Sequence, residues 1–150
     1  MRIAIVKLSA LGDIVHAMVV MQFIKKFNNE ILIDWIVEES YKDLLDFHPH
    51  INKVHFVNLK HAKKKKSVLT LIKELNKVRK LKSYDVVVDM QGLLKSAIIS
   101  KIISSRKTIG FNMESAREKL APLFYSKTFY YPYSNNIIER NIALIEYALG

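Results

Sequence analysis

The sequence predicts a doubly wound α/β fold with a mainly parallel sheet, formed by one domain of 150 residues. Short runs of β-branched and aliphatic residues recur along the chain. Each run is followed by a turn and then by apolar residues at helical spacing. The connections are short, and no linker rich in Pro, Gly or Ser divides the chain. Strands and helices that alternate in this way are typical of a parallel sheet with right-handed crossovers.

The first predicted unit occupies residues 1–27. Ile3–Val6 is long enough for one buried strand, and Ser9–Asp13 reads as a tight turn with a glycine and a carboxylate. Apolar residues then recur at helical spacing as far as Lys25. Ligands of doubly wound sheets bind outside the carboxyl ends of the strands. We therefore expect the turn Ser9–Asp13 to lie at the functional edge.

The rest of the chain repeats the alternation. Buried or extended segments are predicted over residues 31–37, 54–57, 84–90, 108–110 and 128–131. Helices are predicted over residues 41–47, from Ser67 onward, 93–103, 116–120 and 137–149, with Ser67, Ser115 and either Asn135 or Asn136 as N-caps. Asn58–Lys66 carries no apolar periodicity and is predicted to be a polar basic loop.

The charge balance indicates an anionic partner. The formal net charge is +10, and from Lys53 to Lys82 the only acidic residue is Glu74. Nucleic acid, a phosphorylated small molecule and an anionic membrane surface all fit such a balance. The chain has no cysteine, and its histidines and acids show no metal-ligand spacing, so no metal is expected. Neither a signal peptide nor a membrane-spanning stretch is recognisable.

Asp13 is the first candidate for chemistry. A carboxylate at a strand end beside a helix N-terminus can act as a general base toward an acceptor hydroxyl. The commoner role of an aspartate at such a place is to cap the helix. Gly12 permits a positive φ and a close backbone approach, but one glycine does not make the fingerprint of a dinucleotide site.

The remaining candidates follow other strands. A cluster of lysines, which includes Lys60, Lys63 and Lys64, follows the third predicted strand and could bind phosphates or carboxylates or could simply be solvated. Gln91 follows the fourth strand and could donate a hydrogen bond to a sugar hydroxyl, although the same place suits ordinary turn chemistry. Arg117 is a third cationic candidate, with a surface arginine as the alternative.

Four segments together resemble the lipopolysaccharide heptosyltransferase family, heptosyltransferase I in particular. They are MRIAIVKLSALGDIVHAM, DWIVEE, DVVVDMQGLLKSA and SAREKLAPLFY, and they occur in order over almost the whole chain. The resemblance implies an inverting glycosyltransferase of the GT-B type, with two Rossmann-like domains that face each other across a cleft. Residues 1–150 would then be the acceptor-binding half, a Rossmann-like three-layer sandwich.

The resemblance also assigns roles to residues. Asp13 matches the proposed base, and Ser9 and Gly12 shape the loop that carries it. Lys60, Lys63, Lys64 and Arg117 match residues that bind the acceptor, and Gln91 lies at the edge of the cleft. Lys60 and Lys63 stand where arginines are common in the family, which weakens bidentate carboxylate recognition.

The implied reaction moves heptose from ADP-heptose to Kdo2-lipid A in lipopolysaccharide inner-core synthesis. It would take place in the cytoplasm, at the cytoplasmic face of the inner membrane, and would need no cofactor. The implied partners are the acceptor, ADP-heptose and the anionic membrane surface, with no nucleic acid. Chains of this family are about twice as long, so the donor domain is expected to be absent from this chain, which alone would be inactive.

Two other functions remain compatible with the sequence. The surface of residues 53–82 could belong to a nucleic-acid or polyanion-binding module, although its lysines are not interleaved with the aromatic residues and glycines of single-strand binders. The chain could also be a free-standing, non-catalytic Rossmann-like domain that serves in assembly.

Overall fold

The computed structural model describes residues 1–150 and confirms an α/β fold around one parallel sheet. The sheet has six strands in the order β3-β2-β1-β4-β5-β6, and every neighbouring pair is parallel. The strands are β1 (Arg2–Val6), β2 (Leu32–Glu38), β3 (Lys53–Val57), β4 (Tyr84–Asp89), β5 (Ser105–Phe111) and β6 (Lys127–Phe129). The chain winds from β1 toward β3 and then crosses back to β4. The winding therefore reverses between β1 and β4, where doubly wound sheets place their ligands.

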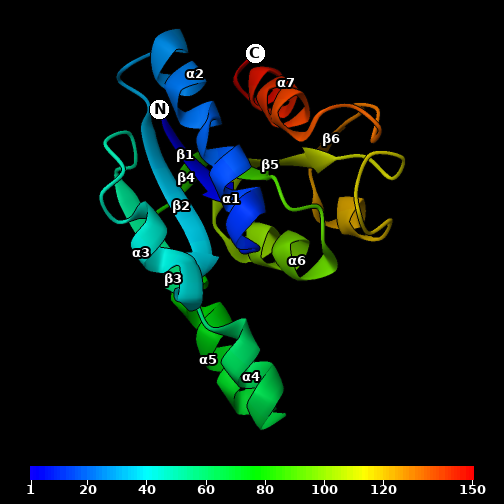
Figure 1. The fold of residues 1–150 in the computed structure, drawn as a ribbon. Coiled ribbons are helices and arrows are strands. Elements are labelled where there is room, and N and C mark those ends of the chain that lie inside the picture. The colour runs from blue at the N-terminus through cyan, green and yellow to red at the C-terminus, as the bar shows by residue number, and fades with distance from the viewer.

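Helices cover both faces of the sheet (Figure 1). They are α1 (Leu11–Met18), α2 (Val20–Phe27), α3 (Lys42–Leu45), α4 (Leu59–Lys65), α5 (Val68–Arg79), α6 (Leu94–Ile102) and α7 (Ile137–Leu149), with short 3₁₀ helices η1 (Glu39–Tyr41) and η2 (Ala121–Phe124). The helices α1, α2 and α7 pack on one face, and α5 and α6 on the other. No helix combines the length and the apolar character needed to cross a bilayer.

The core follows the two-residue period of the strands. In β1, Ile3 and Ile5 point toward α1, α2 and α7, whereas Ala4 and Val6 point toward α5 and α6. All four side chains are fully buried. Burial on both faces explains why the central strands are almost uninterrupted apolar runs.

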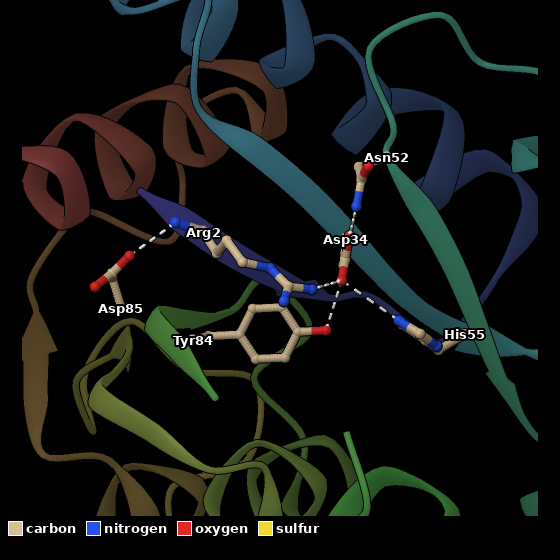
Figure 2. A network of polar contacts seen from close by, with 6 residues as sticks. All are labelled: Arg2, Asp34, Asn52, His55, Tyr84 and Asp85. Atoms are coloured by element: carbon tan, nitrogen blue, oxygen red, sulfur yellow. Dashed lines mark hydrogen bonds and ion pairs between the residues drawn. The ribbon is translucent and has the colours of Figure 1, made fainter. Parts of the chain in front are cut away.

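A buried acid joins four strands at their amino ends (Figure 2). Asp34 of β2 accepts hydrogen bonds from Tyr84 Oη at 2.7 Å, from Arg2 Nη2 at 2.9 Å and from Asn52 Nδ2 at 2.8 Å, and it lies 3.4 Å from His55 Nε2. Burial alone would raise the pKa of Asp34, but these hydrogen bonds outweigh it and hold the pKa below its ordinary value. This network lies at the edge opposite to the predicted site and serves the fold.

Three sequence-based predictions of local structure are wrong. The segment predicted as a basic loop forms α4, because Asn58 Oδ1 caps it by accepting from His61 N and because Ala62 is buried. Residues 116–120 form turns rather than a helix, and Ser115 is no N-cap since its Oγ accepts from Tyr131 N at 2.9 Å. The single helix expected after Asp13 begins earlier, at Leu11, and breaks at Val19 into α1 and α2.

Candidate functional site

The structure places every predicted site residue on a connection that leaves the carboxyl edge of the sheet. Ser9, Gly12 and Asp13 follow β1, and Gln91 follows β4. Arg117 lies in the turns after β5, and the lysines at positions 60, 63 and 64 lie on α4, which follows β3. The shared edge expected from the sequence is therefore present. Along that edge, the residues that follow β1, β4 and β5 approach one another closely, whereas the lysines that follow β3 lie apart from them.

A small cavity of about 80 Å³ lies between the ends of β1, β4 and β5 and the start of α7. Three predicted residues, Asp13, Gln91 and Arg117, line it together. The other lining residues are Lys7, Met90, Gly92, Phe111, Ser115, Tyr133, Ile137 and Arg140. Residues far apart in the sequence thus meet at the place where the winding of the sheet reverses, between β1 and β4.

Asp13 is the third residue of α1 and is half-buried. Its Oδ2 accepts a hydrogen bond from Ala10 N at a long 3.4 Å, while Ala10 is the N-cap residue. Asp13 is therefore not the N-cap residue of α1, which was the alternative to a catalytic role in the sequence analysis. One weak contact leaves most of the accepting capacity of the carboxylate to the cavity.

Gln91 fixes the segment that carries Asp13. Its side-chain Oε1 accepts from Leu8 N at 2.9 Å and from Ser9 N at 3.2 Å, and its Nε2 donates to Ser9 Oγ at 3.2 Å. Asp89 in turn accepts from Gln91 N at 2.8 Å through its Oδ1. The turn after β4 therefore holds the turn after β1. Since Ser9 Oγ and the Gln91 amide bond to each other, turn structure accounts for both side chains without a ligand.

Gly92 and Arg117 are linked through the backbone. Gly92 has φ +70°, which a residue with a side chain adopts only under strain, and a Cβ there would lie 3.4 Å from Arg117 N. The Gly92 carbonyl accepts from Glu118 N at 3.0 Å. This contact brings the exposed Arg117 to the cavity. Gly12 has no such constraint: its φ is not positive, and a Cβ there would meet nothing within 4 Å, so the conformational freedom that a glycine permits is not used there.

Two buried cations in the cavity were not predicted from the sequence. Lys7 is 6% exposed, and its Nζ donates to Met90 O at 3.2 Å. Burial lowers its pKa, while the carboxylates of Asp13 and Asp89 oppose that shift. The sequence did contain a signal for Lys7 as a site residue, because Lys7 directly follows the buried run of β1 at the carboxyl edge.

Arg140 of α7 is the second buried cation, 5% exposed and without an acidic partner. Its guanidinium carbon lies 4.6 Å from the ring centre of Phe111 and 4.5 Å from that of Tyr133, and its Nη2 donates to Ser115 O at 2.6 Å. Burial lowers the pKa of Arg140, and its Nε has no hydrogen-bond partner. No local pattern in the sequence shows that α7 returns to the end of β1.

The lysines of α4 lie outside this cavity. Strand β3 is at one end of the sheet, and β2 separates it from β1. Lys60 Nζ lies 3.4 Å from Tyr41 Oη and 4.7 Å from the centre of that ring, whereas Lys63 lines a separate groove between α4 and α5. Lys60, Lys63 and Lys64 thus share the edge with Asp13 but not the pocket.

Glu38 is a buried acid at the same edge of the sheet. It ends β2, is 1% exposed, and its Oε1 has no hydrogen-bond partner. Burial raises its pKa, and the charges of Lys95 and Lys60 oppose that rise. A buried carboxyl at this edge therefore lies within the influence of two cations, Lys60 of α4 and Lys95 of α6.

The chemistry of the cavity follows from its charges. Three cations (Lys7, Arg117 and Arg140) share it with the single carboxylate of Asp13. Such a site can hold an anionic group while the carboxylate accepts a proton from a neighbouring hydroxyl. No group of three or more His, Cys, Asp or Glu side chains is arranged to hold a metal ion.

Comparisons with known proteins agree on one family. The profile of glycosyltransferase family 9 (heptosyltransferase) matches residues 68–150. Lipopolysaccharide heptosyltransferase 1 of Campylobacter coli is 41% identical over 150 residues, which cover 100% of this chain and 42% of that protein. Its namesake in Pseudomonas aeruginosa is 32% identical, over 99% of this chain and 43% of that protein. The chain thus spans less than half the length of these two relatives.

Solved structures give the same answer. E. coli heptosyltransferase WaaC with ADP matches with a TM-score of 0.91 and 29% identity, over 100% of this chain and 48% of that one. The same enzyme with ADP-2-deoxy-2-fluoro heptose gives 0.92 and 30%, over 100% of this chain and 49% of that one.

Proposed function

Because the chain belongs to glycosyltransferase family 9, the heptosyltransferases, we propose that it forms the acceptor-binding half of a lipopolysaccharide heptosyltransferase. The reaction would move heptose from ADP-heptose to Kdo2-lipid A, with inversion at the anomeric carbon. The donor is supported by the matching structures, which hold ADP and an ADP-heptose analogue. The acceptor is argued from the cationic edge of this chain and from the family.

One observation carries the proposal: Asp13 lines a cavity that also contains Lys7, Arg117 and Arg140. In the proposed step, Asp13 takes the proton of the acceptor hydroxyl as that oxygen attacks the anomeric carbon, and the bond from that carbon to the diphosphate breaks. The cations hold an acid group of the acceptor so that its hydroxyl faces Asp13. The departing ADP would be bound largely by residues outside this chain.

Residues outside the cavity have supporting roles in this proposal. Ser9 and Gln91 hold the turn before α1, and Gly12 leaves room beside Asp13. Lys60, Lys63 and Lys64 would bind phosphates or carboxylates of the acceptor that extend beyond the cavity. The place of action would be the cytoplasmic face of the inner membrane, where the protein would be peripheral.

The proposal is tested by titrating the purified chain with a delipidated, soluble form of the Kdo2-lipid A head. We expect Arg117→Ala and the triple exchange of lysines 60, 63 and 64 to alanine each to weaken binding by about tenfold or more, one lost charged contact being worth roughly 1.5–3 kcal/mol. A matched control removes three exposed lysines at or just before the amino ends of strands, Lys53→Gln, Lys82→Gln and Lys127→Gln. If the control loses equal affinity for the acceptor, the effect of the other variants comes from net charge alone.

The role of Asp13 is tested by an assay of heptose transfer rather than by an assay of acceptor binding. With the remainder of the enzyme present, Asp13→Asn is expected to bind the soluble acceptor within about threefold of the parent and to lose transfer by about 10²–10⁴-fold, the usual contribution of a general base. Transfer at the parental rate by Asp13→Asn would remove Asp13 from the reaction.

A further inference from the structure

Helices α4 and α5 form a hairpin that projects from the body of the protein beyond the carboxyl edge of the sheet (Figure 1). The two helices are joined by Lys66, which has a left-handed backbone with φ +50°, and by Ser67. Ser67 Oγ caps α5 by accepting from Thr70 N at 3.2 Å. The first turn of α5 is therefore held at the tip of the hairpin, next to the last residues of α4.

The tip exposes apolar side chains. Leu69 is 80% exposed, Val68 is 70% exposed and Ile72 is 48% exposed, all within the first five residues of α5. These three residues are consecutive or one helical turn apart, so their side chains form one patch. They belong to none of the buried clusters of the core. The fold therefore leaves this patch without a partner inside the described chain.

Basic side chains surround the patch. Residues 59–80 contain nine Lys and Arg residues and one acid, Glu74. That acid is already used, since its Oε2 lies 2.9 Å from Lys77 Nζ and accepts from Asn58 N at 2.8 Å. The lysines beside the tip, Lys63–Lys66 and Lys73, form no salt bridge. Their charge is therefore free to act on an external anionic surface.

We propose that the tip of this hairpin docks the protein on an anionic bilayer surface. Val68, Leu69 and Ile72 enter the boundary between headgroups and acyl chains, and the surrounding lysines contact lipid phosphates. Charge complementarity selects an anionic surface, and the apolar patch selects a bilayer over a purely polar polyanion. Nucleic acid fits less well because residues 59–80 contain no Phe, Trp or Tyr, the large aromatic side chains on which bases stack most strongly.

The direction of the hairpin gives the docking a purpose. The hairpin leaves the edge at which Asp13 and its cavity lie. Docking through the tip would turn that edge toward the bilayer, where a lipid-anchored sugar is presented. The apolar part of the tip is independent of the proposed transfer reaction, because Val68, Leu69 and Ile72 line no part of the cavity of Asp13. Lys63 and Lys64 serve both proposals, since the acceptor and the lipid headgroups are both anionic.

The test is co-sedimentation of the chain with vesicles of phosphatidylcholine, with and without added phosphatidylglycerol, at about 0.1 M salt, where charges act over about 10 Å. The parent is expected to bind the anionic vesicles about tenfold or more tightly than the neutral ones. The triple exchange of Val68, Leu69 and Ile72 to serine should lower binding to anionic vesicles about tenfold. It should leave binding of the soluble acceptor head unchanged, and circular dichroism checks that it folds.

Matched controls distinguish the effect of the tip from that of exposed apolar side chains elsewhere and from that of net charge. Phe27→Ser, Leu120→Ser and Leu123→Ser together remove equally exposed apolar side chains elsewhere and should change vesicle binding less than about twofold. Lys64→Gln, Lys65→Gln and Lys73→Gln should abolish the preference for anionic vesicles, whereas the control triple at positions 53, 82 and 127 should preserve it.

A direct readout comes from Leu69→Trp. The chain has one tryptophan, Trp35, which is fully buried and provides a constant background. A blue shift and quenching by brominated lipid on addition of anionic vesicles would support insertion of the tip. Three results would overturn the proposal: equal binding to neutral and anionic vesicles, unchanged vesicle binding by the serine triple, or self-association of the parent that the serine triple abolishes without any vesicle effect. Tight binding of RNA with no vesicle binding would assign the lysines to nucleic acid instead.

Discussion

The Gln91 side chain donates from Nε2 to Ser9 Oγ at 3.2 Å, across 82 residues of sequence. The same side chain accepts from Ser9 N through Oε1. This pair joins the turns after β1 and β4, the two strands between which the winding of the sheet reverses. The position of Asp13, four residues after Ser9, is therefore set partly by a side chain from the other half of the sheet.

Replacing Gln91 tests that link. Gln91→Leu leaves Leu8 N and Ser9 N without their acceptor, and we expect it to lower the free energy of unfolding by about 2 kcal/mol in urea titrations. Ser9→Ala is the matched control, because it removes only the contact to Nε2 and should cost no more than about 1 kcal/mol. Equal costs for the two variants would contradict the assignment of the main contact to Oε1.

The Asp34 network predicts a specific pH dependence. The pKa of Asp34 is lower in the folded state than in the unfolded chain, where it is about 3.9. Its stabilisation is therefore complete above that unfolded value and is lost as the pH falls through the folded value. We expect Asp34→Asn to lower the free energy of unfolding by about 3 kcal/mol near pH 7, with a difference from the parent that shrinks steadily below about pH 4.

An exposed acid provides the comparison for Asp34. Asp43 of α3 is exposed and forms no salt bridge, so Asp43→Asn should leave both the stability and its pH profile close to those of the parent. A difference between Asp34→Asn and the parent that is independent of pH down to pH 2 would exclude ionisation of Asp34 as its cause.

Replacement by alanine is expected to change the stability of the fold very differently at two glycines. A Cβ at Gly110 would overlap the ring of Tyr125, whose Oη is fixed by a hydrogen bond of 2.5 Å to Asp89. Gly110→Ala should therefore destabilise the fold by about 2–3 kcal/mol, as overpacking does. Gly12→Ala meets open space within α1 and should be neutral or stabilising by up to about 1 kcal/mol. Thermal unfolding of both variants decides the point.

Lys7 is expected to cost stability rather than provide it. Since burial lowers its pKa, the unfolded chain holds a proton there more tightly, and the folded state gains stability as the pH rises toward the unfolded value of about 10.4. Lys7→Met should therefore be at least as stable as the parent near pH 7, and its advantage should shrink with rising pH. Loss of soluble acceptor binding without loss of stability would show that Lys7 acts on a ligand. A large loss of stability would instead assign Lys7 to the fold.

The strands were predictable because burial on both faces of a parallel sheet requires apolar runs, and Ile3–Val6 is such a run. Helix α4 was missed because its four lysines obscure the single buried apolar contact made by Ala62. Its formation depends on the Asn58 cap and on packing against α5, which are tertiary facts. The turns after β5 were missed because Ser115 has the same composition signal whether its hydroxyl caps a helix or binds Tyr131.

The candidate site was predictable in part for the same reason. Asp13, Gln91 and Arg117 each follow a strand, so topology alone brings them to one edge. Lys60, Lys63 and Lys64 also follow a strand and reach the same edge, but the sequence does not show that β2 separates β3 from β1 and so keeps them out of the cavity. Arg140 could not be found, since its place depends on how α7 packs against the sheet.

Strand β1 lies inside the sheet and is the first strand to be synthesised, but its pairing with both neighbours is completed late. β1 is held on one side by β2 and on the other by β4, which begins about eighty residues later. During synthesis on the ribosome, one side of β1 therefore waits, apolar and unpaired, until most of this chain has emerged. Contacts of such long sequence separation slow folding and expose nascent chains to aggregation. Yield in cells should therefore depend on chaperone supply more than the final stability of the protein suggests.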